Sequence, residues 1–491
     1  MPTDNPSRRI AVIDLGSNTA RLVLLSAEPG STYRQIDEIR EVVRLRKGMT
    51  DEGLAEDAVQ RAFSTLSLFK RFCDSRRVDE ILAVATSAVR DAANGPALIA
   101  SVERDIGLSI KILPGEREAY YGVLGVLNEV PVEDGYVLDI GGGSAQVSEV
   151  CERRYDSEYE AIKKEVQRQI ESVPKAKGKR PLAGLGGTIR NLATVEAERS
   201  NYPLNTLHGF SLSRKELVKT IRKLRRLPLA RREHIPGLNR DRADIILPGA
   251  MVAREVMDRL GVKKMQVSEG GLREGLFHER FLSDQADPIV SDIRAFSVLN
   301  LARNYGYDQS HSEQVRHLAG RLFDQTMPLH GYGPEERVLL DAAALLHDLG
   351  MVIGYTSHHK HSQTLIEHSG LPGYTPRESA LIALLTRYHR KGKPDTSEYR
   401  DLLNRGDTKR LTCLAALLRT AEYLERERNS IVADVKVTWD KKHLRISLVA
   451  EAHPSVEIWQ AEQHAVPLLE SVFNLTVVFD SLTPSGTPTQ K

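Results

Sequence analysis

The sequence is poor in cysteine and has no long apolar run. Its 491 residues include only three cysteines, Cys73, Cys151 and Cys413, which are far apart and odd in number. This pattern argues against a disulfide framework and for a reducing compartment. The sequence also has no signal peptide and no run of about 18 apolar residues. We therefore expect a cytoplasmic protein without integral membrane association.

The net charge is close to zero and excludes little by itself. The 68 basic and 66 acidic residues leave a formal charge of +2. Local basic clusters are present, however, since residues 213–242 hold eleven Lys or Arg against three acids. A second cluster contains Lys175, Lys177, Lys179 and Arg180. A solvated helix face is the ordinary interpretation, and guidance of a long polyanion is the alternative. We expect no nucleic-acid partner.

Two similar motifs open the two halves of an α/β region. The apolar run Ile10–Ile13 leads into the turn Asp14–Thr19, and a second apolar run, Leu22–Leu25, follows. Tyr136–Leu138 leads in the same way into Asp139–Ser144. This spacing predicts strand, tight turn, strand in both places, and the common frame indicates two duplicated lobes.

The rest of the sequence predicts alternating strands and helices up to about residue 290 and a mainly helical region after it. Further elements of the α/β region are expected as helices at 57–72 and 96–106, strands at 80–85 and 181–183, and a glycine-rich turn at 184–187. Helical periodicity dominates from 292 to 429, where nine of the fifteen histidines lie between His311 and His389. Residues 431–480 predict two strands, one helix at 456–473 and a last strand at 475–479.

The two glycine-rich turns are suited to bind phosphate and a cation. Backbone N–H groups in such turns form anion nests, hydroxyl groups add donors, and Asp14 and Asp139 are suited to hold Mg²⁺ against phosphate oxygens. The alternative is that both turns are only hairpin connections. The sequence contains no GxxxxGK[ST] motif, which argues against P-loop chemistry, and Ile189 replaces the third glycine of GxGxxG after Gly184.

Six motifs follow one another in order between residues 10 and 276: AVIDLGSNTARLVLL, VATSAVRDAANG, GEREAYYGVLGV, VLDIGGGSAQV, LAGLGGTIRNLA and VSEGGLREGL. Together they resemble the Ppx/GppA family of exopolyphosphatases and guanosine pentaphosphate phosphohydrolases, which has the core of sugar kinases, actin and Hsp70. The resemblance implies an α/β fold of two actin-like, RNase H-like lobes at 1–128 and 129–290. An all-α HD-like domain at 291–430 and a small α+β domain at 431–491 would follow.

The resemblance also implies Mg²⁺-dependent hydrolysis of the terminal phosphate of inorganic polyphosphate. Glu118 matches the family's catalytic acid and would activate water, although Arg117 replaces the usual glutamate and Glu116 is the alternative. Arg90 matches an arginine that faces phosphate, whereas its ordinary interpretation is an ion pair with Asp91. The implied metal ligands are Asp14 and Asp139, and the implied phosphate-binding residues are Ser17, Asn18, Thr19, Arg21, Gly141, Gly142, Gly143 and Ser144.

The histidine-rich region carries a second hypothesis. His311, His347 and Asp348 have the His…His-Asp order of HD-type metal phosphohydrolases, with His361 and His389 downstream. Glu422 stands where that superfamily has an aspartate, and a longer side chain changes the reach. A metal site is one interpretation, chain binding and dimer contacts are a second, and ordinary core and surface histidines are a third.

Several alternatives remain open at the level of sequence. No residue separates an exopolyphosphatase from a guanosine pentaphosphate (pppGpp) phosphohydrolase, and ppGpp is a related ligand. An ATPase or sugar kinase on the same core, and an HD-type hydrolase with sensory front lobes, are further classes. Glu269 has either a supporting or a purely structural role. The family pattern has a further segment after Arg154 that this sequence lacks, which predicts a break or an unusually short connection to Tyr155. We expect a homodimer.

Overall fold

The structure is a computed structural model that describes residues 7–130, 135–140, 180–487 and 489. These residues form two compact units, one within 1–202 and 207–293 and the other within 203–206 and 294–491. The boundary at Ile293 and Arg294 lies close to the expected boundary at 290/291. The finer division of each unit into two domains stays a prediction. No helix of the described residues is long and apolar enough to cross a membrane.

A mixed five-stranded sheet forms the core of the first half of the first unit. Its order is β3-β2-β1-β4-β5, antiparallel from β3 to β1 and parallel from β1 to β5. The predicted hairpin is present, because Leu22 pairs with Ile13 on the neighbouring strand. The strands are β1 (Arg8–Leu15), β2 (Thr19–Glu28), β3 (Thr32–Val42), β4 (Glu80–Ala85) and β5 (Lys111–Ile112).

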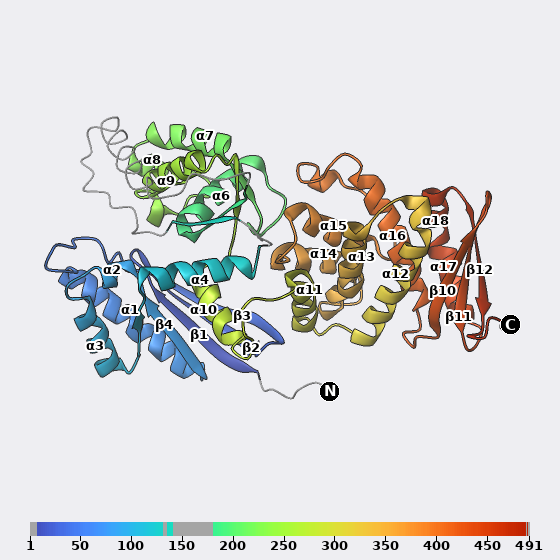
Figure 1. The fold of residues 1–491 in the computed structure, drawn as a ribbon, viewed down its shortest axis with the longest axis horizontal. Helices are drawn as coiled ribbons and strands as arrows, with labels where there is room; N and C mark the ends of the chain where they lie inside the picture. The colour runs from blue at the N-terminus through green and yellow to red at the C-terminus, as the bar shows by residue number, and fades with distance from the viewer. Residues whose placement is uncertain (1–6, 131–134, 141–179, 488, 490–491) are drawn as a thin grey trace. The chain divides into compact units, whose positions relative to one another are not determined.

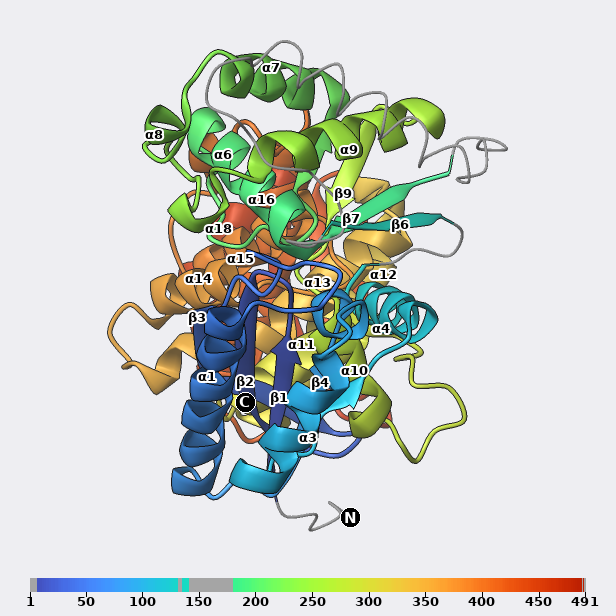
Figure 2. The same ribbon diagram turned by 90° about the vertical axis from the view of Figure 1, so that its left-hand side faces the viewer.

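Helices cover both faces of this sheet. Ala11, Ile13 and Leu15 face a core that includes α1 (Glu56–Ser75) and α3 (Gly95–Ile106), two helices that the sequence predicted, and Figure 2 shows both beside β1 and β2. On the other side, α10 (Leu272–Phe281) contacts β1 and packs along α4 (Gly115–Leu127). Strand β1 is therefore buried on both faces.

A second sheet and its helices complete the first unit. Its order is β6-β7-β9-β8, with β8 antiparallel to β9 and the other pairs parallel. The apolar end of α4 packs on β7 through Val126 and Leu185, so α4 contacts both halves (Figure 1). The elements are β6 (Tyr136–Asp139), β7 (Leu182–Leu185), α6 (Gly186–Ser200), β8 (Ser211–Ser213), α7 (Arg214–Arg225), α8 (Leu229–Arg232), α9 (Ile246–Arg259) and β9 (Lys264–Val267).

The expected glycine-rich turn at 184–187 is not a separate element. Gly184 and Leu185 complete β7, and Gly186 and Gly187 begin α6 directly. Gly186 has φ +87°, a backbone conformation that residues other than glycine rarely adopt. The chain therefore changes from strand to helix within one residue, and this brings the first turn of α6 to the end of β6.

The second unit is helical at first and ends in a small sheet. Its helices are α11 (Ile293–Asn304), α12 (Gln309–His330), α13 (Pro334–Leu346), α14 (His358–Ser369), α15 (Pro376–Tyr388) and α16 (Asp407–Leu424), followed by α17 (Ser455–His464) and α18 (Val466–Phe473). The sheet has the order β10-β11-β12, with β10 (Val432–Trp439), β11 (His443–Ala450) and β12 (Thr476–Leu482). Helix α12 packs on β10, and α16 packs on α17 and α18.

One helix that the sequence predicted at 456–473 is divided in two. Helix α17 ends at His464 and α18 begins at Val466, with Pro467 in its first turn. Proline has no backbone N–H and its ring clashes with the preceding turn, so a continuous helix through this position is disfavoured. The prediction of a single helix was wrong for that reason.

Candidate active site

One pocket of the first unit collects most of the residues expected to carry chemistry. It has a volume of about 120 Å³ and lies where the ends of β1, β6 and β7 meet the first turns of α4, α6 and α10. Its lining residues are Asp14, Gly16, Ser17, Asn18, Thr19, Arg21, Thr86, Ser87, Glu118, Asp139, Leu185, Gly186, Gly187, Arg190, Arg242, Gly271, Leu272, Arg273 and Glu274. Carboxylates and guanidinium groups therefore face the same small space.

Asp14 lies near the end of the central strand β1. It pairs with Arg21 on β2 and with Val84 on β4, so its backbone is enclosed by the sheet on both sides. Burial raises the pKa of the carboxyl group from 3.8 to about 6, although nearby Arg273 and Arg21 act in the opposite direction. Its Oδ1 atom is buried and has no hydrogen-bond partner. An orphaned carboxylate oxygen of this kind is suited to bind a cation.

Asp139 holds the equivalent position at the end of β6. Burial again raises its pKa to about 6, and Glu118 and Asp14 add to the shift. The first turn of α6 approaches closely, because a Cβ atom on Gly186 would lie 2.4 Å from Asp139 Oδ1. Gly122 on α4 faces Oδ2 in the same way, at 3.9 Å. Glycine is therefore required by this close approach at position 186, whereas position 122 has room for a Cβ atom.

The turn at residues 16–18 is held rigidly by its neighbours. The N–H of Gly16 donates to Thr19 O (3.1 Å), and the N–H groups of Val43 and Leu45 donate to Asn18 O and Ser17 O. Asn18 Nδ2 is buried and has no hydrogen-bond partner, which leaves an amide donor next to the pocket. Ser17, Asn18 and Thr19 line the pocket together, and their predicted binding of phosphate stays a prediction.

Glu118 reaches the pocket from the first turn of α4. Its Oε2 atom lies 2.7 Å from Arg90 Nη1, and the same nitrogen donates to Leu113 O at 2.8 Å. Arg90 is not among the lining residues; it fixes the carboxylate of Glu118, and it also lies 3.6 Å from Asp91. Arg90 therefore forms ion pairs with Glu118 and, at longer distance, with Asp91, and its role at a phosphate stays a prediction.

The neighbours of Glu118 point elsewhere. Glu116 is exposed and does not line the pocket. Arg117 donates to Glu279 Oε1 (2.9 Å) and to the hydroxyl group of Tyr121 (2.6 Å), on the side of α4 that faces α10. The unusual arginine therefore joins two helices, and of the two candidate acids only Glu118 lies in the pocket.

Four guanidinium groups face the acids, and the sequence analysis named only Arg21 among them. Arg190, Arg242 and Arg273 also line the pocket. Burial and the neighbouring Arg273 and Arg190 together lower the pKa of Arg21 to about 10. Burial, Arg40 and Arg190 lower the pKa of Arg242 to about 10 in the same way. Cations that destabilise one another in this way form a site of positive potential for an anion. Arg190 and Arg273 lie inside two of the family-like motifs, LAGLGGTIRNLA and VSEGGLREGL, and this position was the feature of the sequence that could have identified them.

Glu274 is a further acid that the sequence interpretation did not select. Its Oε2 atom accepts a hydrogen bond from the N–H of Gly271 at 2.8 Å. Burial alone would raise its pKa, but Arg273, Arg190 and backbone N–H groups together lower it below the usual value. Glu274 is therefore ionised and balances part of the arginine charge.

Glu269 and the second glycine-rich turn are the remaining candidates that the sequence offered. Glu269 does not line the pocket: its carbonyl oxygen accepts from Arg190 (2.8 Å) and its carboxylate accepts from the N–H of Leu207 (3.2 Å). It thus supports Arg190. Gly141, Gly142, Gly143 and Ser144 lie outside the described residues, as do the connection at Arg154 and Tyr155 and the cluster at Lys175, Lys177 and Lys179.

The basic segment 213–242 has two kinds of side chain. Helix α7 buries Leu217, Ile221 and Leu224 and exposes most of its Lys and Arg, as in an ordinary amphipathic helix. Arg232 and Arg242 are buried instead, and Arg242 reaches the pocket.

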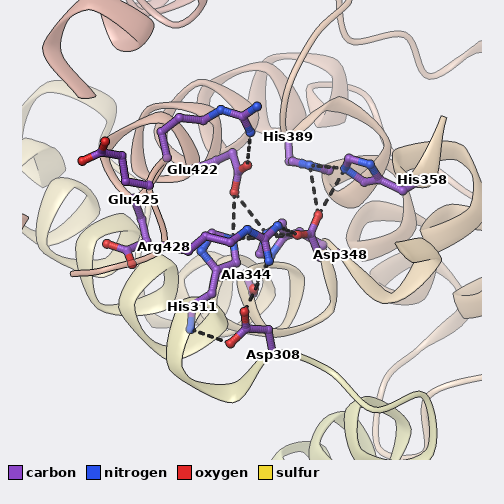
Figure 3. A network of polar contacts seen from close by, with 12 residues as sticks. Asp308, His311, Ala344, Asp348, His358, His389, Glu422, Glu425 and Arg428 are labelled. Carbon is purple, nitrogen blue, oxygen red and sulfur yellow. Dashed lines mark hydrogen bonds and ion pairs between the residues drawn. The ribbon is translucent and has the colours of Figure 1, made fainter. Parts of the chain in front are cut away.

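The histidine-rich region also brings its predicted residues together. His311, His347, Asp348, His389 and Glu422 form one buried cluster in the second unit (Figure 3). His358 contributes the remaining imidazole, in place of the expected His361.

The first unit is thus a two-sheet α/β core with acids and arginines around one pocket. The chain belongs to the Ppx/GppA phosphatase family: the family model matches residues 24–159 and 152–284, and the model of Ppx/GppA phosphatase domain III matches residues 293–462. The two stretches matched by the family model overlap at residues 152–159.

Solved structures of similar proteins include the Aquifex aeolicus member of the Ppx/GppA family. It is 24% identical over 57% of this chain and 100% of that chain, with a TM-score of 0.48. An exopolyphosphatase from Cytophaga hutchinsonii is 22% identical over 58% of this chain and 100% of that chain, with a TM-score of 0.49.

Proposed function

We propose that the chain is a Mg²⁺-dependent exopolyphosphatase that releases the terminal phosphate of inorganic polyphosphate. The observation that supports this most is the composition of the pocket, in which Asp14, Glu118 and Asp139 share one space with four guanidinium groups. A phosphoanhydride chain end carries several negative charges, and hydrolysis needs a cation, a base for water and charge stabilisation. The residues of this pocket offer all three.

Asp14 and Asp139 are the proposed ligands of Mg²⁺. Both carboxyl groups have raised pKa values, and Asp14 Oδ1 is a buried atom without a hydrogen-bond partner. Two carboxylates together with waters and substrate phosphates are the ordinary environment of this ion. When bound, Mg²⁺ neutralises charge on the phosphate oxygens.

Glu118 is the proposed base. Arg90 and the rigid start of α4 hold its carboxylate, so it is oriented before substrate arrives. It would accept a proton from the attacking water while the water oxygen forms a bond to the terminal phosphorus. The bridging P–O bond breaks at the same step, and the shortened chain leaves with the bonding electrons. Arg90 acts here as a positioning residue.

Arg21, Arg190, Arg242 and Arg273 are the proposed ligands of the phosphate chain, together with the turn at Ser17, Asn18 and Thr19. Arg242 Nη1 and Arg273 Nη1 are buried and without a hydrogen-bond partner, and guanidinium groups bind phosphate with two parallel hydrogen bonds. Gly141, Gly142, Gly143 and Ser144 belong to the proposal from the family motif alone.

The alternative substrate is pppGpp, whose 5′ end also presents a terminal phosphate on a phosphoanhydride. The test is phosphate release from long polyphosphate and from pppGpp, measured in parallel with Mg²⁺ and with EDTA. We expect release from polyphosphate that requires Mg²⁺. Release from pppGpp alone would transfer the assignment to the alternative, and release from neither substrate would contradict the proposed function. We also propose that the protein is a cytoplasmic homodimer, and analytical ultracentrifugation tests the dimeric state.

A further inference from the structure

The second unit holds a buried cluster of four imidazoles and two carboxylates that the proposed function does not use. His311 comes from α12, His347 follows α13, His358 begins α14, His389 follows α15, and Glu422 lies on α16. Asp348 is the residue next to His347. The four histidines and Glu422 are at most 5% exposed, so these groups are almost entirely removed from water. Buried charges and imidazoles in such numbers are paired or coordinate a metal.

Backbone carbonyl groups fix three of the imidazoles in one orientation. The Nδ1–H groups of His347, His358 and His389 donate to Ala344 O (2.7 Å), Tyr355 O (2.9 Å) and Thr386 O (2.7 Å). In its neutral form, each of these rings presents the lone pair of Nε2 to the cluster. This is the arrangement in which proteins hold metal-binding histidines.

The Nε2 atoms of the four imidazoles face one another in two pairs. His311 Nε2 lies 3.1 Å from His347 Nε2, and His358 Nε2 lies 3.3 Å from His389 Nε2 (Figure 3). With Nδ1 protonated and both rings neutral, the second pair brings two lone pairs together, which is repulsive unless a metal ion or an additional proton lies between them.

Glu422 completes a first triangle of donor atoms. Its Oε2 atom lies 3.1 Å from His347 Nε2 and 3.3 Å from His311 Nε2, and it makes no hydrogen bond of acceptable geometry. Ligands about 2.1 Å from one ion, at angles between octahedral and tetrahedral, are about 3.0–3.4 Å apart. The three sides of this triangle fall within that interval.

Asp348 links this triangle to a second one. Its Oδ1 atom lies 3.1 Å from His358 Nε2 and 3.7 Å from His389 Nε2, again without a hydrogen bond of acceptable geometry. Its Oδ2 atom lies 3.6 Å and 3.8 Å from the Nε2 atoms of His347 and His311. One carboxylate thus faces two pairs of imidazoles with its two oxygens.

We propose that the second unit binds two divalent metal ions, bridged by Asp348, one held by His311, His347 and Glu422 and the other by His358 and His389. Nitrogen-rich ligands of this kind suit Mn²⁺, Fe²⁺ or Zn²⁺ better than Mg²⁺, which prefers oxygen. The pocket of the first unit offers only oxygen ligands, so the two sites differ in the metal they select.

Arg428 is the structural rival to the metal ions. Its guanidinium group pairs with Asp348 Oδ2 and lies 3.4 Å from Asp308 Oδ2. An ion pair with Arg428 satisfies one oxygen of Asp348, but it leaves Oδ1 and the pair of His358 and His389 without a cation. The metal-free interpretation therefore predicts that the cluster binds no divalent ion.

The test measures metal content in the tag-free full chain. The protein is stripped with EDTA, dialysed against Mn²⁺ in the presence of excess Mg²⁺, and analysed by mass spectrometry of the metal. We expect two Mn²⁺ per chain. His358→Ala should lower this to about one, and Asp348→Asn should lower it to less than one. His368→Ala, an exposed histidine on the same helix as His358, is the matched control and should keep two.

Two further measurements keep the test independent of folding and of the proposed function. Circular dichroism and gel filtration identify variants that fold, and Co²⁺ in place of Mn²⁺ should give visible absorption bands that His358→Gln changes. Asp14→Asn, which removes a proposed ligand of the first unit, should leave the two Mn²⁺ in place even if no substrate is hydrolysed. One ion or none per wild-type chain, or two ions that persist in folded Asp348→Asn protein, would overturn the proposal.

Discussion

Replacing Asp14 with asparagine should stabilise the metal-free protein while abolishing hydrolysis. The carboxyl group of Asp14 is buried beside the pocket, and burial raises its pKa from 3.8 to about 6. A raised pKa means that the folded state disfavours the ionised form. The unfavourable contribution is absent below pH 3.8, grows as the pH rises to 6, and is complete above pH 6. Asparagine has nearly the same shape and no charge.

The expected gain follows from the size of the shift. A pKa difference of about two units corresponds to about 3 kcal/mol at pH 7.5. An amide N–H left without a partner in the mutant would offset about 1–2 kcal/mol of this. We therefore expect a gain of about 1–2 kcal/mol, which for a unit of this size corresponds to roughly 2–8 °C in the melting temperature.

Differential scanning fluorimetry in EDTA measures this gain at pH 7.5 and at pH 4. Asp14→Asn should raise the first melting transition at pH 7.5 and leave it almost unchanged at pH 4. Mg²⁺ should stabilise the wild type more than the variant, because it binds the folded carboxylate. Asp51→Asn, at an exposed position, makes the same charge change as a control. A fall in melting temperature at pH 7.5, or a gain equal at both pH values, would refute the reasoning.

Three other outcomes follow from named contacts. A Cβ atom on Gly275 would lie 1.9 Å from Tyr121 O, so Gly275→Ala should separate α4 from α10 and lower the free energy of unfolding in urea by about 1–3 kcal/mol. The control Gly115→Ala, whose added Cβ atom would meet no neighbour, should lower it less. Equal losses in the two variants would count against close packing of α4 on α10. Arg90→Lys should lower kcat about tenfold with little change in KM, because lysine cannot make both contacts of the guanidinium group; an unchanged kcat would remove its positioning role. Raising KCl should increase KM for long polyphosphate more than for triphosphate if the exposed face of α7 guides the chain, and equal increases would exclude that role.

Local features of the fold followed from the sequence because they depend on near neighbours. The hairpin around Asp14, helix α1 and strand β4 are set by apolar spacing and by one glycine-rich turn, and all three are present. The prediction of a single helix at 456–473 overlooked Pro467, which is the local indication that the helix is interrupted there.

The arginines of the pocket could not be assigned by the same reasoning. Arg242 and Arg273 meet Arg21 only because distant segments of the chain close around one pocket, and no spacing in the sequence encodes that closure. The family motifs contain Arg273 but do not say which way it faces. The sequence left open whether Arg90 faces phosphate or forms an ion pair, and the structure shows its contact with Glu118.

The histidine cluster illustrates the same limit. The sequence predicted that His311, His347 and Asp348 belong together, and the helices do bring them together. Three histidines, His358, His359 and His361, are available at the start of α14. Which of them faces Asp348 depends on the rotation of that helix, and the structure selects His358.

The central claim is that Glu118 activates water in the pocket of the first unit. The most direct measurement is the initial rate of phosphate release from long polyphosphate with Mg²⁺, for wild type, Glu118→Gln, Glu116→Gln and His347→Ala. The account predicts a loss of about 100-fold or more in Glu118→Gln. It predicts rates near wild type for the exposed Glu116→Gln and for His347→Ala in the second unit. Activity kept in Glu118→Gln and lost in His347→Ala would contradict it.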